Sequence, residues 1–109
     1  MTKLPFKIQE RKIYYAKNIG AGNSYLLMLS GYEKYEYFDA IKFIATHSNL
    51  GPSKVRVGDL DWIPIKKFMQ KELIKGDIIE GCEVYMTYLK DHFLILDIVL
   101  PSDMLKKAA

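Results

Sequence analysis

Residues 75–101 read KGDIIEGCEVYMTYLKDHFLILDIVLP and contain the clearest structural pattern in the chain. From Cys82 to Thr87 apolar and polar residues alternate, which is the period of a β-strand with one buried and one solvated face. Residues 93–100 form a second, more apolar run that ends at Pro101. Two such runs joined by a short polar loop predict a β-hairpin. The alternation also predicts that Cys82, the only cysteine, is buried.

The composition is that of a globular protein, with 109 residues of which 50% are hydrophobic and 27% charged. A chain of this length predicts one domain. It has no apolar run of membrane-spanning length, and its first residues lack the apolar core of a signal peptide. We therefore expect a cytoplasmic protein without a membrane partner. The expected organisation is an N-terminal arm or edge strand at 1–10, one folded domain at 11–101 and a short C-terminal tail at 102–109.

Turn signals divide the first half of the chain into short strands. Residues 11–19 and 24–30 flank a turn whose glycines accept the positive φ of a tight connection. Residues 35–47 predict a long third strand, with a bulge or bend where the alternation slips at Asp39 and Ala40. A helix over residues 37–45 is the competing interpretation, because several apolar residues there share a helical face.

A different period follows residues 54–57, which predict a short extra strand. Ile65, Phe68, Met69 and Leu73 recur at three- and four-residue spacing, while the residues between them are polar. This spacing predicts one short amphipathic helix. Asp61 is a suitable cap before it, Pro64 is tolerated in a first turn, and Gly76 closes the segment.

The resulting order of elements is similar to that of the OB-fold, in which a helix sits between strands three and four of a β-barrel. The resemblance covers residues 11–101 and includes the bent third strand and the turn at Gly76 and Asp77. It implies a mostly β fold, a five-stranded OB-like Greek-key barrel with one short helix. Within that family the chain looks most like the small single-stranded-DNA-binding proteins of phages and other viruses, which act in DNA replication or recombination.

This resemblance implies sequence-independent binding of single-stranded DNA, with bases stacked on exposed aromatic rings and lysines on the phosphates. The net charge of +3 and the basic clusters interleaved with eight tyrosines fit that mode of binding. The candidate residues lie on the expected polar sides of strands and in loops: Lys12, Tyr14, Lys17, Tyr25, Tyr32, Lys34, Tyr37, Lys42, Lys54, Arg56, Tyr85, Lys90 and His92.

The same resemblance implies a homo-oligomer, because one small domain offers a short binding track. Replication or recombination proteins are possible partners. Many cellular single-strand binders recruit such proteins through an acidic C-terminal tail, however, and this chain ends with Lys106, Lys107, Ala108 and Ala109. Recruitment by that route is therefore in doubt.

No motif predicts catalysis, a metal site or a cofactor. His47 and His92 lack zinc-ligand spacing, and the turn at 20–24 lacks the lysine and helix of a phosphate-binding loop. Two alternatives to DNA binding remain. One is a protein-interaction module, such as a small viral inhibitor or structural protein. The other is a small metal-independent nuclease with His47 as general base beside Lys54 and Arg56.

Overall fold

The predicted C-terminal hairpin is present in the computed structural model, which describes residues 12–101. Its strands are β7 (Glu83–Tyr88) and β8 (Phe93–Val99), which pair antiparallel with a bulge between Tyr85 and Met86. Val84 and Met86 point into the core, as the alternation predicts, and Cys82 is buried. The N-terminal arm or edge strand expected at 1–10 and the tail expected at 102–109 lie outside the described residues.

The first strands also agree with their sequence pattern. β1 (Ile13–Ile19) and β2 (Ser24–Met28) pair antiparallel around the glycine-containing turn, and β4 (Ser53–Val57) is the predicted extra strand. β3 (Ala40–Ile44) confirms a strand over the competing helix, although it is shorter than predicted. Residues 35–39 are a loop, so the break in alternation at Asp39 marks the start of the strand rather than a bulge.

The helix predicted after Asp61 is wrong. Residues 63–67 form β5 (Ile63–Lys67), a single 3₁₀ turn η1 (Phe68–Gln70) follows, and β6 (Lys71–Glu72) folds back against β5. β5 is paired antiparallel with β4 and parallel with β8, so sheet pairing on both sides takes up its backbone groups and overrides the local helical period. Within residues 12–101 the structure contains no helix of the length and hydrophobicity needed to cross a bilayer.

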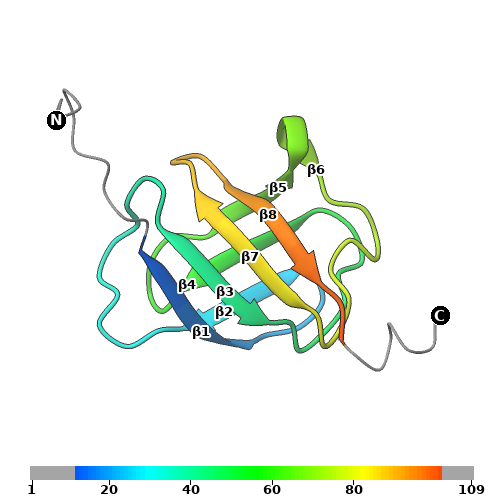
Figure 1. Cartoon of the computed structure of the whole chain (residues 1–109), viewed down its shortest axis with the longest axis horizontal. Helices are drawn as coiled ribbons and strands as arrows, with labels where there is room; N and C mark the ends of the chain where they lie inside the picture. Colours follow the sequence, from blue (N-terminus) through cyan, green and yellow to red (C-terminus); the bar gives the residue numbers. More distant parts are fainter. Residues whose placement is uncertain (1–11, 102–109) are drawn as a thin grey trace, which may run out of the picture.

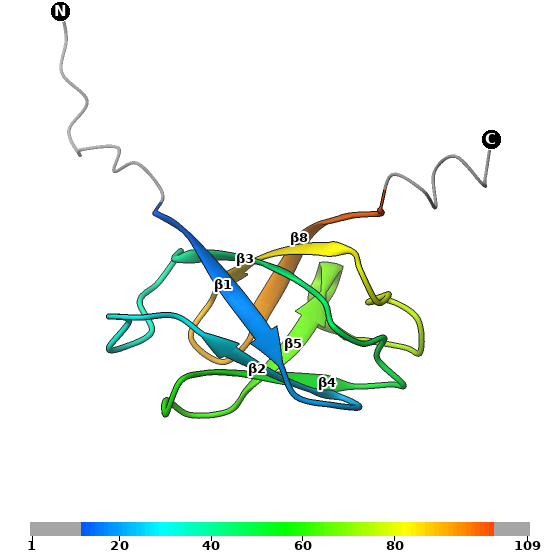
Figure 2. The ribbon, with the colours of Figure 1, turned by 90° about the horizontal axis from the view of Figure 1, so that it is seen from below.

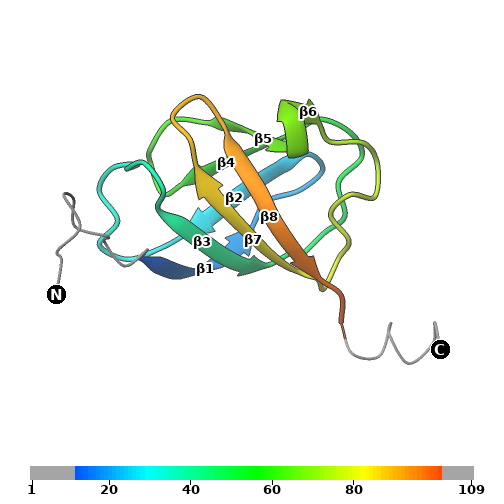
Figure 3. The same cartoon turned by 45° about the horizontal axis from the view of Figure 1, so that its top comes forward.

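Seven strands close into a barrel in the order β4, β2, β1, β3, β7, β8, β5, with β5 returning to β4 (Figure 1). Seen from below, β3 and β8 run along one side of the molecule and β2 and β4 along the opposite side (Figure 2). β6 extends β5 outside the closed ring, and the turn between them projects from one rim (Figure 3). The barrel expectation is therefore confirmed, whereas the five-strand count and the helix are not.

The barrel interior is filled by side chains from alternate positions of the strands, as the period of two requires. This core brings buried residues from six of the barrel strands and the loops together, and β1 adds the partly buried Tyr14 and Ala16, so no single hairpin buries an apolar face alone. The buried apolar residues packed together there are Tyr25, Leu27, Ile41, Phe43, Ala45, Val55, Val57, Ile65, Leu73, Ile78, Cys82, Val84, Met86 and Phe93.

Asn49 holds the loops together at the rim that carries the β5–β6 turn. The side chain is fully buried, and its Oδ1 accepts a hydrogen bond from the N–H of Ile78 at 2.9 Å. Its Nδ2 donates to the carbonyls of Gly51 and Ile74 at 2.8 and 2.9 Å. One amide thus satisfies three backbone groups from two loops that lie far apart in sequence. A fully satisfied buried amide of this kind stabilises one arrangement of the loops.

We predict that Asn49→Ala lowers the free energy of unfolding by about 2–4 kcal/mol, because it leaves several buried backbone groups without partners. Urea denaturation followed by circular dichroism measures this loss. Ser30→Ala, at an exposed position, is the control and should change stability by less than about 0.5 kcal/mol. Equal stability of the Asn49 variant and the wild-type protein would contradict a structural role for this amide.

Candidate nucleic-acid interface

Aromatic side chains close the other end of the barrel and are mostly packed against one another. The rings of Tyr14 and Tyr32 meet edge to face at 5.0 Å between centroids, and those of Tyr35 and Tyr88 stack at 5.1 Å. The Tyr35 hydroxyl donates to the carbonyl of Asp61 at 2.8 Å and accepts from a backbone N–H. Tyr14 and Tyr32, both predicted to stack on bases, are therefore half-buried in this aromatic cluster.

Tyr25 is fully buried, so its predicted role as a stacking platform is wrong. β2 places Tyr25 and Leu27 inward. The Tyr25 ring stacks on the His47 ring with centroids 4.3 Å apart, and its hydroxyl donates to the His47 carbonyl at 3.0 Å. The predicted loop contact from His92 is also wrong, because this side chain is buried and its Nδ1 lies 2.6 Å from a carboxylate oxygen of Asp91.

The geometry of His47 disfavours the nuclease alternative. Nδ1 lies 3.1 Å from the hydroxyl of Thr46, and Nε2 is buried with no hydrogen-bond partner in the described part of the chain. A general base needs a nitrogen within reach of the proton it removes. Burial withdraws Nε2 from a substrate, and Nδ1 already lies beside the Thr46 hydroxyl. The described residues also contain no group of three or more His, Cys, Asp or Glu side chains that could hold a metal ion.

Two of the predicted residues, Lys42 and Tyr85, lie half-buried on the outer face of β3 and β7, beside the exposed Tyr15 of β1. Tyr15, Lys42 and Tyr85 are neighbours across the three strands. The Lys42 Nζ lies 5.8 Å from the centre of the Tyr15 ring, 4.9 Å from that of Tyr85 and 4.0 Å from a carboxylate oxygen of Glu83. Asp97 of β8 lies opposite Tyr85 in the register of the β7–β8 pairing. We call Tyr15, Lys42 and Tyr85 the tyrosine strip; acidic neighbours offset its single cation.

Tyr15 is 69% exposed and was not among the predicted site residues. The sequence pattern placed Tyr14 on the wet side of the first strand, whereas the structure turns Tyr14 inward and Tyr15 outward. Strand alternation is strict, so an assignment that is off by one residue exchanges the two faces. The loose alternation of apolar residues in 11–19 gave no signal strong enough to choose between them.

A second exposed set surrounds Trp62 on the outer face of β4 and β5. The Lys54 Nζ lies 4.8 Å from the centre of the indole ring, and the Arg56 guanidinium carbon lies 5.0 Å from it. Both distances are within the range of a cation–π interaction. The Nε of Arg56 is buried and has no hydrogen-bond partner among residues 12–101. Trp62 itself remains 38% exposed.

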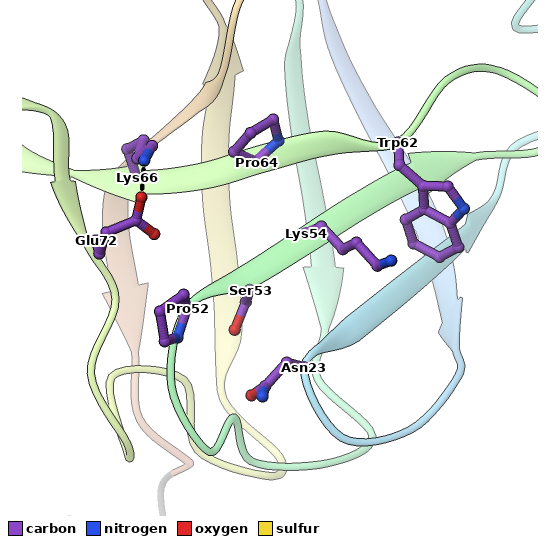
Figure 4. A pocket seen from close by; sticks show the side chains of 8 residues that line it. All are labelled: Asn23, Pro52, Ser53, Lys54, Trp62, Pro64, Lys66 and Glu72. Carbon is purple, nitrogen blue, oxygen red and sulfur yellow. Dashed lines mark hydrogen bonds and ion pairs between the residues drawn. The ribbon is translucent and has the colours of Figure 1, made fainter.

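Beside Trp62 lies a pocket of about 340 Å³. Figure 4 shows Trp62 immediately before β5 and Pro64 on that strand, with Lys54 of the neighbouring β4 reaching toward the indole ring. Lys66, which also lines the pocket, forms an ion pair with Glu72. The lining residues are Asn23, Pro52, Ser53, Lys54, Trp62, Pro64, Lys66 and Glu72. We call Trp62, Lys54, Arg56 and this pocket the tryptophan pocket surface.

Trp62 was also not among the predicted site residues. The signal for it is the alternation of Trp62, Pro64 and Lys66 with Ile63 and Ile65, which is the period of a strand with one outer face. The helical spacing of the residues that follow predicted a helix instead, so this alternation was not assigned to a strand. The lysine and arginine on β4 were predicted to bind DNA, and the structure brings both of them to this ring.

The remaining predicted residues are dispersed. Lys12 and Lys34 line a shallow pocket of about 240 Å³ that also contains Glu33, Glu36 and Asp39, and Lys34 pairs with Glu36 at 3.6 Å. With two lysines against three carboxylates, this pocket has no excess of positive charge. Three others are exposed elsewhere, on β1, before β3 and in the β7–β8 turn: Lys17, Tyr37 and Lys90.

Burial raises the pKa of several phenols, which links stability to alkaline pH. Desolvation, and then the Asp39 carboxylate, raise the pKa of Tyr32, and desolvation raises the pKa of Tyr25 and of the Cys82 thiol. The folded groups keep their protons where the unfolded ones lose them. Their contribution to stability is therefore complete below the unfolded pKa and falls as the pH rises above it.

We predict that the free energy of unfolding in urea falls from about pH 9 to about pH 11, where unfolded Cys and Tyr ionise. Tyr25→Phe removes one ionising phenol and should make this decline shallower. A stability that stays constant across the interval, or a decline that is equally steep in the variant, would contradict the linkage.

Comparison of the chain with protein-family models, with curated proteins and with solved structures found no match. Among the sites described above, the tryptophan pocket surface combines an exposed aromatic ring, two cations near that ring and an apolar pocket.

Proposed function

We propose that this protein binds single-stranded DNA without sequence preference, through the tryptophan pocket surface. The observation that supports the proposal is the position of Lys54 and Arg56 over the exposed indole of Trp62, at the edge of an apolar pocket. Stacking of a base on an aromatic side chain contributes about 1–3 kcal/mol and tolerates any base, because every base has a π-face.

The composition of this surface suits a nucleotide. The two prolines and the indole provide apolar walls for a base. Three cations, Lys54, Arg56 and Lys66, stand against one carboxylate, Glu72, so the surface has a net positive charge that favours phosphate. The tyrosine strip has comparable rings, but Lys42 and the exposed Lys17 of β1 are matched by Glu83 and Asp97, which makes it the weaker candidate for a polyanion.

The wider role follows from the resemblance stated above. Sequence-independent binding suits a protein that covers exposed single strands during DNA replication or recombination, in a phage or another virus. It needs no catalytic step, and several copies along one strand would lengthen the short track of each domain. The cytoplasm of the host is the expected location.

A protein-interaction module is the second candidate, and one observation favours it. Large apolar side chains are exposed on the outer face of β1, β3 and β8, among them Ile13, Ile19, Ile44 and Val99. Exposed apolar patches mark interaction surfaces on many proteins. This candidate predicts no binding of nucleic acid at the tryptophan pocket surface.

We predict that oligo-dT quenches the fluorescence of Trp62, the only tryptophan, and that the affinity falls as salt is raised because binding releases counterions. A titration at low and at high salt measures both effects. Quenching that is absent at low salt would reject the proposal and leave the protein-interaction module.

We predict that Lys54→Ala weakens oligo-dT binding and reduces the slope of log affinity against log salt by about 1, because one phosphate contact is lost. Lys42→Ala removes the same charge from the tyrosine strip, on another side of the barrel, and should have a smaller effect. A larger loss from Lys42→Ala than from Lys54→Ala would show that the binding surface has been assigned to the wrong face.

A further inference from the structure

The outer face of β5 continues past the tryptophan pocket surface. Trp62, Pro64 and Lys66 are alternate residues and all line the pocket. Phe68 is the next residue in this alternation, and the backbone of Lys67 before it is extended. The Phe68 side chain is 79% exposed, more than any other large apolar residue in the described part of the chain. An aromatic ring therefore stands near each end of β5.

The exposure of Phe68 has no explanation in the packing of the barrel. The adjacent Met69 is 73% exposed, and Met69 and Gln70 have left-handed backbones with φ of +65° and +57°. Tight turns of this kind favour asparagine and glycine, which adopt such angles at little cost. Polar residues would be more favourable than Phe68 and Met69 at this exposed turn. The apolar tip therefore indicates a role in binding.

Side-chain contacts hold the turn between β5 and β6 in place. Lys66 pairs with Glu72 across β5 and β6, and the Nζ of Lys67 lies 2.9 Å from a carboxylate oxygen of Asp77. The same oxygen accepts the N–H of Ile74 at 2.8 Å. These contacts tie the hairpin to the loop that follows it, so Phe68 is presented by an anchored hairpin at the rim of the barrel (Figure 3).

We propose that Phe68 is the second stacking platform of a single-stranded DNA track that starts at Trp62 and follows the outer face of β5. This inference rests on the proposed function. Six residues of extended strand separate the two rings, which corresponds to about 20 Å. Stacked bases at about 3.4 Å each would place about six nucleotides over that length, within the range of about 4–16 nucleotides found for single β-barrel domains.

The experiment compares two ligands that differ in reach. A dT dinucleotide is long enough for Trp62 alone, whereas an oligo-dT of about eight nucleotides spans both rings. We expect Phe68→Ala to weaken binding of the longer ligand by about 5- to 150-fold, the equivalent of one lost stacking contact. Binding of the dinucleotide should change by less than about twofold, and Phe68→Tyr should restore the longer ligand's affinity.

Ile44→Ala is the matched control, because Ile44 is also apolar, is 54% exposed and lies on β3, which pairs with neither β4 nor β5. It should leave both affinities unchanged. Equal binding of the longer ligand by Phe68→Ala and wild-type protein would overturn the track, even though wild-type quenching would uphold the proposed function. Absence of quenching in the wild-type protein would reject the proposed function itself.

An anionic membrane surface is the rival occupant of an apolar tip flanked by lysines. Sedimentation with vesicles of phosphatidylserine and phosphatidylcholine tests it. If the wild-type protein binds the vesicles, and Phe68→Ala abolishes that binding but leaves oligo-dT binding unchanged, the tip is a membrane contact and the track is wrong.

Discussion

Closure of the barrel through β5 is the constraint on which the rest of the structure depends. β5 pairs with β4 on one side and with β8 on the other, and Ile65 takes part in both pairings, opposite Ser53 and Phe93. Ile65 and Phe93 are both fully buried, so the same register that joins the strands also fills the interior. Without these two pairings the sheet would have two unpaired edges and an apolar face open to water.

Closure also determines which aromatic residues are available at the surface. A small barrel must fill its interior and close its ends with side chains. Here Tyr25 fills the interior, and Tyr14, Tyr32, Tyr35, Tyr88 and Phe93 pack together at one end. Most of the rings that a single-stranded-DNA-binding protein would use are therefore committed to the fold. The exposed rings near cations, above all Trp62, carry the functional argument.

The strand face that holds Trp62 combines apolar and cationic side chains. Its rings and prolines are apolar, and its lysines and arginine are cationic with few acidic neighbours. Lys54 and Arg56 belong to β4 and Trp62 adjoins β5, so the pairing of these two strands assembles the surface. The same pairing that closes the barrel thus creates the candidate binding site, which links stability to the proposed function.

The sequence by itself determined those features that depend on neighbouring residues in the chain. Period-two alternation and turn residues were enough for the C-terminal hairpin, the buried Cys82 and the first hairpin, whereas the barrel was expected from the resemblance of the element order to the OB-fold. Tertiary structure decided the rest. β5 adopts a strand against its helical spacing because β4 and β8 compete for its backbone. The inward side of β1, the burial of Tyr25 and the meeting of Lys54, Arg56 and Trp62 depend on contacts between residues distant in sequence, and no local pattern encodes which strands become neighbours.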